Sequence, residues 1–161
     1  MSGPDNPEVR FTSALARLLK YFNLLEENIG LCIAHLVNSS NPKASYPLLA
    51  RMTAEQKMDR LREIFVSGEV IADNVSILEF EEWFELAARA RSIRNRYVHG
   101  HWEYLPMRSQ KPVGVRAPAW MREKLGHEAE ETMSLTDLEA VVDEMESVFD
   151  GFMRIRKKHG L

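Results

Sequence analysis

The sequence has little cysteine, no long apolar run and almost no excess of charge. Cys32 is the only cysteine among 161 residues, which excludes an intrachain disulfide framework and fits a reducing compartment. No apolar run approaches the roughly 20 residues that a membrane-spanning helix needs, so we expect no membrane association. The formal net charge of −3 gives no global electrostatic argument for nucleic-acid binding, and any such argument must be local.

The N-terminus also lacks the pattern of a secretory signal. The stretch MSGPDNPEVR has no cationic start followed by an apolar segment, so we expect a soluble, cytoplasmic protein. The length suits a single domain over residues 1–161 that buries a core of its own. The hydrophobic share of 45% and the charged share of 28% are ordinary for a globular protein.

What the sequence does contain is helical periodicity, in four segments. Apolar residues recur at alternating spacings of three and four from Phe11 to Leu36, the pattern of one helix face. Similar stripes occur three more times along the chain. The predicted helices cover about residues 8–38, 53–67, 76–99 and 136–158. Four such helices predict an all-α fold, an antiparallel four-helix bundle.

Three of these helices begin with the spacing of a capping box, in which a hydroxyl and a carboxyl or amide satisfy free backbone donors. The pairs are Thr53 with Gln56, Ser76 with Glu79, and Thr136 with Glu139. The buried face expected for the third helix consists of Trp83, Leu86, Ala90, Ile93 and Tyr97, widened by Phe80, Phe84, Ala87 and Val98.

Between the third and fourth helices, from His101 to Met133, the helical period disappears. The stretches HWEYLP, VGVRAPAW and ETMSL alternate loosely, and Pro106, Pro112 and Pro118 interrupt them. We therefore expect an irregular loop with room for a small β-hairpin. A stretch of this length without regular structure is usually functional or mobile.

The densest chemistry lies at the end of the third helix, in ARSIRNRYVHGHW from residue 90 onward. Arg91, Asn95 and His99 are four residues apart and share one stripe. Arg94 precedes His99 by five residues, about 140° around an ideal helix. Arg94 and His99 would therefore converge only if the last turn unwinds or if two copies meet. The alternative is a solvated arginine face with a histidine where a helix end favours a cation.

This helix end, RNRYVHG, resembles the HEPN superfamily, with Arg94, Asn95 and His99 on its Arg-polar-x-x-x-His signature. The resemblance covers the helices across roughly residues 8–100 and 135–158. It implies a helical bundle that commonly forms a homodimer and, in many members, a metal-independent endoribonuclease of a toxin or defence system, with an antitoxin protein as a partner. Other members lack activity, so the alternative is a binding module for a nucleotide, RNA or protein.

The resemblance implies a reaction that needs no cofactor, because the RNA 2′-hydroxyl attacks its own adjacent phosphate. His99 would move the proton, Arg94 would hold the phosphate in its forked donor geometry, and Asn95 would orient His99 or donate to the phosphate. The residues expected to bind RNA or phosphate beside them are Arg91, Arg96, His101 and Trp102. Trp102 or Tyr104 would stack on an unpaired base, or simply pack the loop onto the bundle.

Weaker signals leave other interpretations open. His99 and His101 could hold a metal, although no third ligand has matching spacing, so we expect no metal site. Glu26 and Glu27 could face the arginines or form a solvated surface. Cys32 lies on the apolar stripe of the first helix and is expected in the core.

Overall fold

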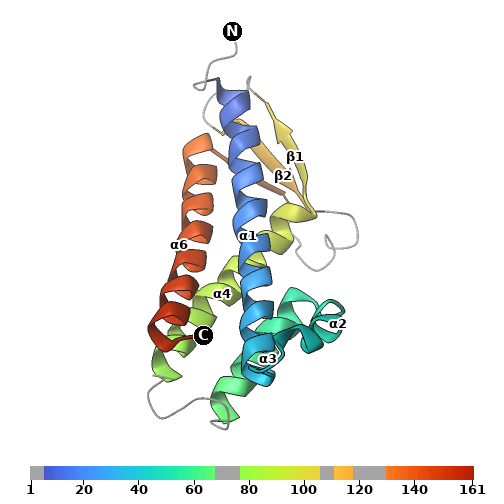
Figure 1. Cartoon of the computed structure of the whole chain (residues 1–161). Coiled ribbons are helices and arrows are strands. Elements are labelled where there is room, and N and C mark those ends of the chain that lie inside the picture. The colour runs from blue at the N-terminus through green and yellow to red at the C-terminus, as the bar shows by residue number, and fades with distance from the viewer. Residues whose placement is uncertain (1–5, 68–76, 106–110, 118–129) are drawn as a thin grey trace. The chain divides into compact units, whose positions relative to one another are not determined.

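The computed structural model describes residues 6–67, 77–105, 111–117 and 130–161. The helices are α1 (Pro7–Val37), the 3-10 helix η1 (Pro42–Ser45), α2 (Tyr46–Leu49), α3 (Ala54–Ser67), α4 (Ile77–Val98) and α6 (Leu135–His159), and the strands are β1 (His101–Tyr104), β2 (Val113–Arg116) and β3 (Glu130–Met133) (Figure 1). The chain forms two compact units. The first unit is Met1–Tyr21 with Ser92–Glu146, and the second is Phe22–Arg91 with Ser147–Leu161. That the chain is one domain stays a prediction.

The long helix α1 begins where the sequence supplies both a cap and a proline. The side chain of Asn6 accepts a hydrogen bond from the backbone N–H of Glu8 at 3.0 Å, and Pro7 occupies the first helical position, where no N–H is missed. The predicted apolar stripe is confirmed over most of its length. Its fully buried members are Leu18, Phe22, Leu25, Ile29 and Cys32.

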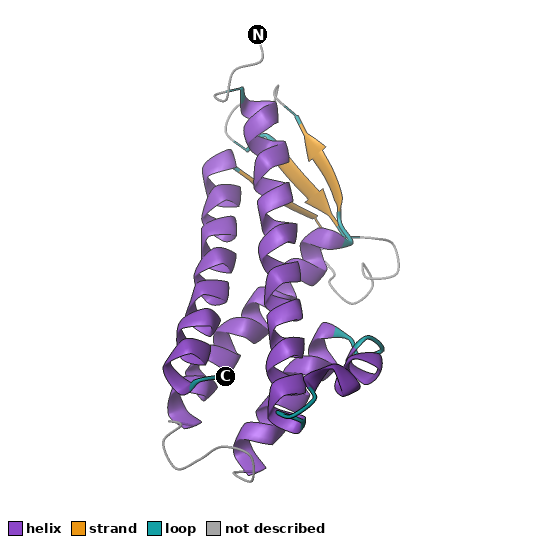
Figure 2. Ribbon diagram, in the orientation of Figure 1, coloured by secondary structure: helices purple, strands orange, loops and turns teal. Residues whose placement is uncertain are grey.

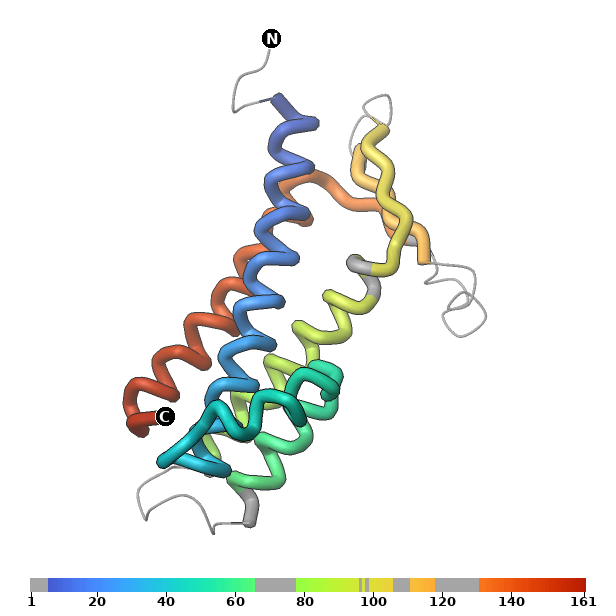
Figure 3. Tube along the Cα trace, turned by 45° about the vertical axis from the view of Figure 1, so that its right-hand side comes forward, coloured from blue at the N-terminus to red at the C-terminus, as the bar shows by residue number. Residues whose placement is uncertain are grey.

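In the first unit, polar pairs join α1 to the start of α6, and the two helices run side by side there (Figure 3). Arg10 and Glu139 are 2.6 Å apart, and Glu146 accepts hydrogen bonds from Tyr21 at 2.5 Å and Arg17 at 2.8 Å. The guanidinium of Arg10 lowers the pKa of the Glu139 carboxyl. The Tyr21 hydroxyl, followed by Arg17, lowers the pKa of Glu146 in the same way.

The capping box predicted for the fourth helix is wrong by two residues. Ser134 and Asp137 form it instead, because the N–H of each residue donates to the side chain of the other, at 2.9 and 3.1 Å. Glu139 is therefore free to pair with Arg10 rather than with Thr136. The observed pair overlaps the predicted pair in the sequence and lies two residues earlier.

The stretch expected to be an irregular loop contains a three-stranded antiparallel sheet in the order β1-β2-β3 (Figure 2). Strands β1 and β2 lie within the stretches HWEYLP and VGVRAPAW, and β3 begins one residue before the stretch ETMSL. The register pairs Trp102 with Val115 and Tyr104 with Val113, which places these four side chains on one face. Val113 and Val115 are buried, so this inner face belongs to the core of the first unit. The antiparallel pair of β1 and β2 confirms the small hairpin for which the sequence left room, whereas the irregular loop is wrong at these strands.

The second unit is built around buried aromatic rings from α3, α4 and α6. Phe65 and Phe80 stack with their centroids 3.8 Å apart, and Trp83 stacks on Phe152 at 4.6 Å. The indole N–H of Trp83 donates to the carbonyl of Val148 at 3.0 Å, so this buried donor is satisfied. Stacked rings and a paired indole fix how α4 packs on α6 within this unit.

Two expectations for the helices of the second unit have clear outcomes. The capping box of Thr53 and Gln56 is confirmed, with reciprocal hydrogen bonds of 2.9 and 3.2 Å at the start of α3. Leu86, expected on the buried face of α4, is 51% exposed, whereas Ala87 is fully buried. The buried face is thus turned toward Phe84 and Ala87. Ser76, the predicted cap of this helix, lies outside the described residues.

The described residues are mostly helical and are consistent with the predicted helical bundle. The three-stranded sheet is an addition to that fold class. None of the described helices combines the length and the apolar character needed to cross a membrane.

Candidate functional site

The end of α4 lies in the first unit and leads directly into the sheet. The helix ends at Val98, His99 and Gly100 form a bend, and β1 starts at His101. His99 therefore lies outside the helix, and the separation of about 140° expected on an ideal helix no longer constrains it. This is the local unwinding that a convergence of Arg94 and His99 within one copy requires.

Arg94 and Asn95 interact directly on the last turns of α4. The guanidinium Nη1 of Arg94 donates to the side-chain oxygen of Asn95 at 3.0 Å, and both residues are half-buried. A guanidinium presents its N–H donors in a planar fork, the geometry that matches the oxygens of a phosphate. This hydrogen bond links Asn95 to the guanidinium of Arg94, and a role of Asn95 in orienting His99 or in donating to a phosphate stays a prediction.

His99 is exposed, and no described residue hydrogen-bonds to its imidazole ring. Both ring nitrogens are thus accessible to a ligand or to water. An imidazole with one nitrogen donating and the other accepting can take up and release a proton near neutral pH. The side chain of Arg96, between Arg94 and His99 in the sequence, lies outside the described residues.

Arg91, the first member of the predicted stripe, belongs to the second unit and is engaged there. It forms an ion pair with Glu55 at the start of α3. Glu26, considered as a partner for the arginines, pairs instead with Lys57 at 2.7 Å, and Glu27 is exposed. These contacts give Arg91 and Glu26 structural partners within the second unit.

The two aromatic residues after the bend pack against the helices of the first unit. The indole N–H of Trp102 donates to the carbonyl of Tyr97 at 2.6 Å, and its ring lies edge-on to Tyr97 at 5.0 Å. Tyr104 stacks on Phe11 of α1 with centroids 5.7 Å apart. Both rings therefore pack β1 onto helices of the first unit, Trp102 on α4 and Tyr104 on α1, and stacking of either ring on an RNA base stays a prediction.

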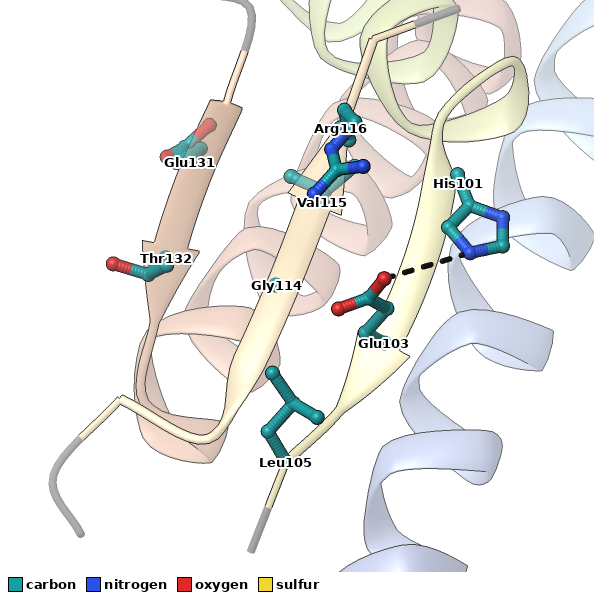
Figure 4. Close-up of a pocket in the computed structure, with 8 residues that line it drawn as sticks. All are labelled: His101, Glu103, Leu105, Gly114, Val115, Arg116, Glu131 and Thr132. Atoms are coloured by element: carbon teal, nitrogen blue, oxygen red, sulfur yellow. Dashed lines mark ion pairs between the residues drawn. The ribbon is translucent and has the colours of Figure 1, made fainter. Parts of the chain in front are cut away.

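The opposite, outer face of the sheet carries polar side chains and a pocket (Figure 4). His101, predicted to bind RNA, lies on this face with its Nε2 atom 3.7 Å from a carboxylate oxygen of Glu103. Across the strand pair, His101 is opposite Arg116 and Glu103 is opposite Gly114. Arg116, Glu103 and Gly114 were not expected at this site from the sequence. The alternation in VGVR was visible, but only the register shows which residues face His101.

The structure thus brings Arg94 and Asn95 together and places His99 and His101 on either side of one glycine, all in the first unit. Among the described residues, no group of three or more histidine, cysteine, aspartate or glutamate side chains has the arrangement of a metal site. Cys32 is buried in the second unit, and this burial raises the pKa of its thiol to about 11, so it is not a nucleophile at neutral pH.

No family model, curated protein or solved structure matches this chain.

Proposed function

We propose that the protein is a metal-independent endoribonuclease of HEPN type that cleaves RNA through attack by the 2′-hydroxyl. The observation that carries the proposal is the end of α4, where Arg94 is hydrogen-bonded to Asn95 and His99 follows as an exposed residue just beyond the helix. This arrangement offers a phosphate ligand and a proton-transfer group, which are the two elements that this reaction needs.

His99 is the proton-transfer residue of the proposed mechanism. The 2′-oxygen forms a bond to the adjacent phosphorus and the bond from phosphorus to the 5′-oxygen breaks, which leaves a 2′,3′-cyclic phosphate and a free 5′-hydroxyl. The attacking hydroxyl loses one proton and the leaving oxygen gains one. An exposed imidazole can do either, and a second copy of the chain would supply a second His99 for the other step.

Arg94 is the proposed charge-stabilising residue, and Asn95 is its positioning residue. The phosphate gains negative charge as the fifth bond forms, and a forked guanidinium can donate to two of its oxygens at once. The bond from Arg94 to Asn95 restricts the guanidinium to fewer rotamers, which reduces the entropy lost on binding. His101, two residues beyond His99, lies next to the site in the chain and can contact the same RNA.

Two parts of the proposal rest on the resemblance to the family rather than on the geometry. One is that the active form is a homodimer with a composite site made by two α4 ends. The other is that the protein serves as a toxin or defence protein, with an antitoxin as a partner. Sedimentation of the purified protein with and without RNA tests the dimer independently of activity.

Incubation of the purified protein with mixed RNA in EDTA tests the cleavage. The wild-type protein should cleave, a His99→Ala variant should not, and a His35→Ala variant should cleave normally, because His35 is an exposed histidine near the end of α1 in the other unit. Equal cleavage by all three proteins, or none by the wild type, would reject the proposal. RNA that binds but stays intact would instead support a non-catalytic binding module.

A further inference from the structure

The outer face of the sheet offers a second site that the cleavage chemistry does not use. Its pocket is lined by His101, Glu103, Leu105, Gly114, Arg116 and Thr132, and their arrangement is visible in Figure 4. All of them belong to the first unit, as do Arg94 and His99. His101 is two residues from His99, so their Cα atoms are at most about 7 Å apart.

The centre of the pocket is Gly114, on the middle strand of the sheet. It has no side chain above the strand, so the floor of the pocket is flat backbone between Glu103 on β1 and Thr132 on β3. A methyl group added at Gly114 would lie 3.9 Å from the Cβ atom of Glu103, which is an ordinary contact. The open floor is therefore not imposed by a lack of space, because the Cβ atom of an alanine would fit there without a clash.

The side chains around this floor carry both positive and negative charges, and this mixture favours a nucleobase over a phosphate as the ligand. A site for phosphate alone would be lined by cations, whereas this pocket is lined by Glu103 and Glu131 as well as by His101 and Arg116, and the Glu103 carboxylate lies beside His101. A carboxylate repels phosphate but accepts hydrogen bonds from base N–H groups. A guanidinium can keep an existing partner and still donate to a base carbonyl, because it has five donors.

We infer that this pocket recognises guanine in single-stranded RNA next to the phosphate that is cleaved, an inference that rests on the proposed function. Guanine has two adjacent donors on one edge, N1–H and the 2-amino group, and the two oxygens of Glu103 can accept both. Its O6 and N7 atoms accept from Arg116. The other three bases lack two adjacent donors on one edge, so they make fewer hydrogen bonds with the same residues.

The first arm of the test maps the cleavage sites of the wild-type protein on RNA of random sequence. Cleavage should favour phosphodiesters next to guanosine, roughly 5- to 100-fold over the other bases. Gly114→Val, which fills the floor, and Glu103→Gln, which removes the paired acceptors, should both reduce this preference while cleavage continues. Gly114→Ala should have an intermediate effect, and Glu85→Gln, on an exposed residue of α4 in the other unit, should have none.

The second arm measures binding without cleavage, by adding GMP, AMP, CMP, UMP or inorganic phosphate to ¹⁵N-labelled wild-type protein. GMP should shift the backbone amide signals of Gly114 and Glu103 at lower concentration than the other ligands do. Equal shifts with all four nucleotides, or with phosphate alone, would overturn the recognition of guanine. The same titration of the Gly114→Val protein should leave the Glu103 amide signal in place.

The two arms separate the two proposals. If RNA is cleaved with no preference at guanosine, the pocket inference fails and the proposed cleavage stands. If no RNA is cleaved but GMP selectively shifts the Gly114 amide signal, the proposed cleavage fails and the pocket stands.

Discussion

The dipeptide His-Gly occurs at the C-terminal end of two helices, and its surroundings differ completely. At the end of α6, in the second unit, the side chain of His159 is only 7% exposed. Its Nε2 atom lies 3.2 Å from Glu79, and its ring faces Phe80 at 5.8 Å. At the end of α4, in the first unit, His99 is exposed and no described residue hydrogen-bonds to it.

At the end of α6, the glycine that follows the histidine ends the helix. Gly160 has a φ of +70°, and the N–H of Leu161 then bonds back to the carbonyl of Arg156 at 2.9 Å, which closes the helix end. The same two residue types can therefore cap a helix or supply an available imidazole. Partners brought from elsewhere in the chain, here Glu79 and Phe80, decide between these two roles.

The largest effect is expected at the end of α4, where His99 is exposed. Replacing Arg94 with alanine should lower kcat/KM for RNA about 100- to 1,000-fold, because one charge-stabilising donor group is lost. Arg94→Lys should not restore activity, since an ammonium lacks the forked geometry. Arg62→Ala, an exposed arginine of α3, is the matched control. Thermal unfolding of each variant shows whether the loss is chemical, and a comparable loss in Arg62→Ala would contradict the assignment.

At the end of α6, where His159 is buried, a substitution should change stability rather than activity. The His159→Ala variant loses the hydrogen bond to Glu79 and a buried ring contact, and should lower the free energy of unfolding by about 1–3 kcal/mol. Urea unfolding measures this change, with His35→Ala as an exposed control. A stable His159→Ala protein that no longer cleaves RNA would reverse the contrast between the two ends.

A smaller effect is expected at the start of α6. Two substitutions there distinguish the observed capping box of Ser134 and Asp137 from the predicted one that begins at Thr136. Ser134→Ala should cost about 0.5–2 kcal/mol of stability, because the N–H of Asp137 loses its acceptor. Thr136→Ala should change stability by less than about 0.5 kcal/mol. Both are read from urea unfolding at neutral pH, and equal costs would contradict the observed cap.

The smallest effect concerns how stability depends on pH at the end of α6, where Glu79 contacts Lys158 and His159. Hydrogen bonds from Lys158, and then from His159, lower the pKa of Glu79 below its usual 4.5. A carboxyl whose folded pKa is depressed stabilises the fold above its unfolded pKa and loses this contribution as pH falls through the folded value. The stability difference between wild type and Glu79→Gln should therefore shrink from about pH 6 to about pH 3. Glu85→Gln should show no such trend.

The features that the sequence predicted well depend on residues close together in the chain. The Thr53 and Gln56 cap and the buried stripe of α1 are of this kind, since the partners are within one or two turns. The strands of the sheet were visible as alternation, but their register was not. Leu86 and Ala87 both suited the apolar face of α4, and only the packing against other helices selected Ala87.

The candidate site was predictable to the same extent. The pattern of Arg94, Asn95 and His99 identified the helix end, but the pairing of Arg91 with Glu55 joins two helices that no local pattern connects. The packing of Trp102 depends on the carbonyl of Tyr97, which becomes available only because the helix ends at Val98. The outer face of the sheet required the register of β1 and β2.

Internal attack at the end of α4 requires a 2′-hydroxyl beside the phosphate that is cleaved, so removing that hydroxyl should abolish cleavage. Two otherwise identical RNA oligonucleotides are compared in EDTA, one of them with a single 2′-deoxynucleotide at the position that is cut. We expect cleavage of the all-RNA strand to a 2′,3′-cyclic phosphate and no cleavage of the substituted strand at that position. Equal cleavage of both strands, or products that carry a 5′-phosphate, would contradict it.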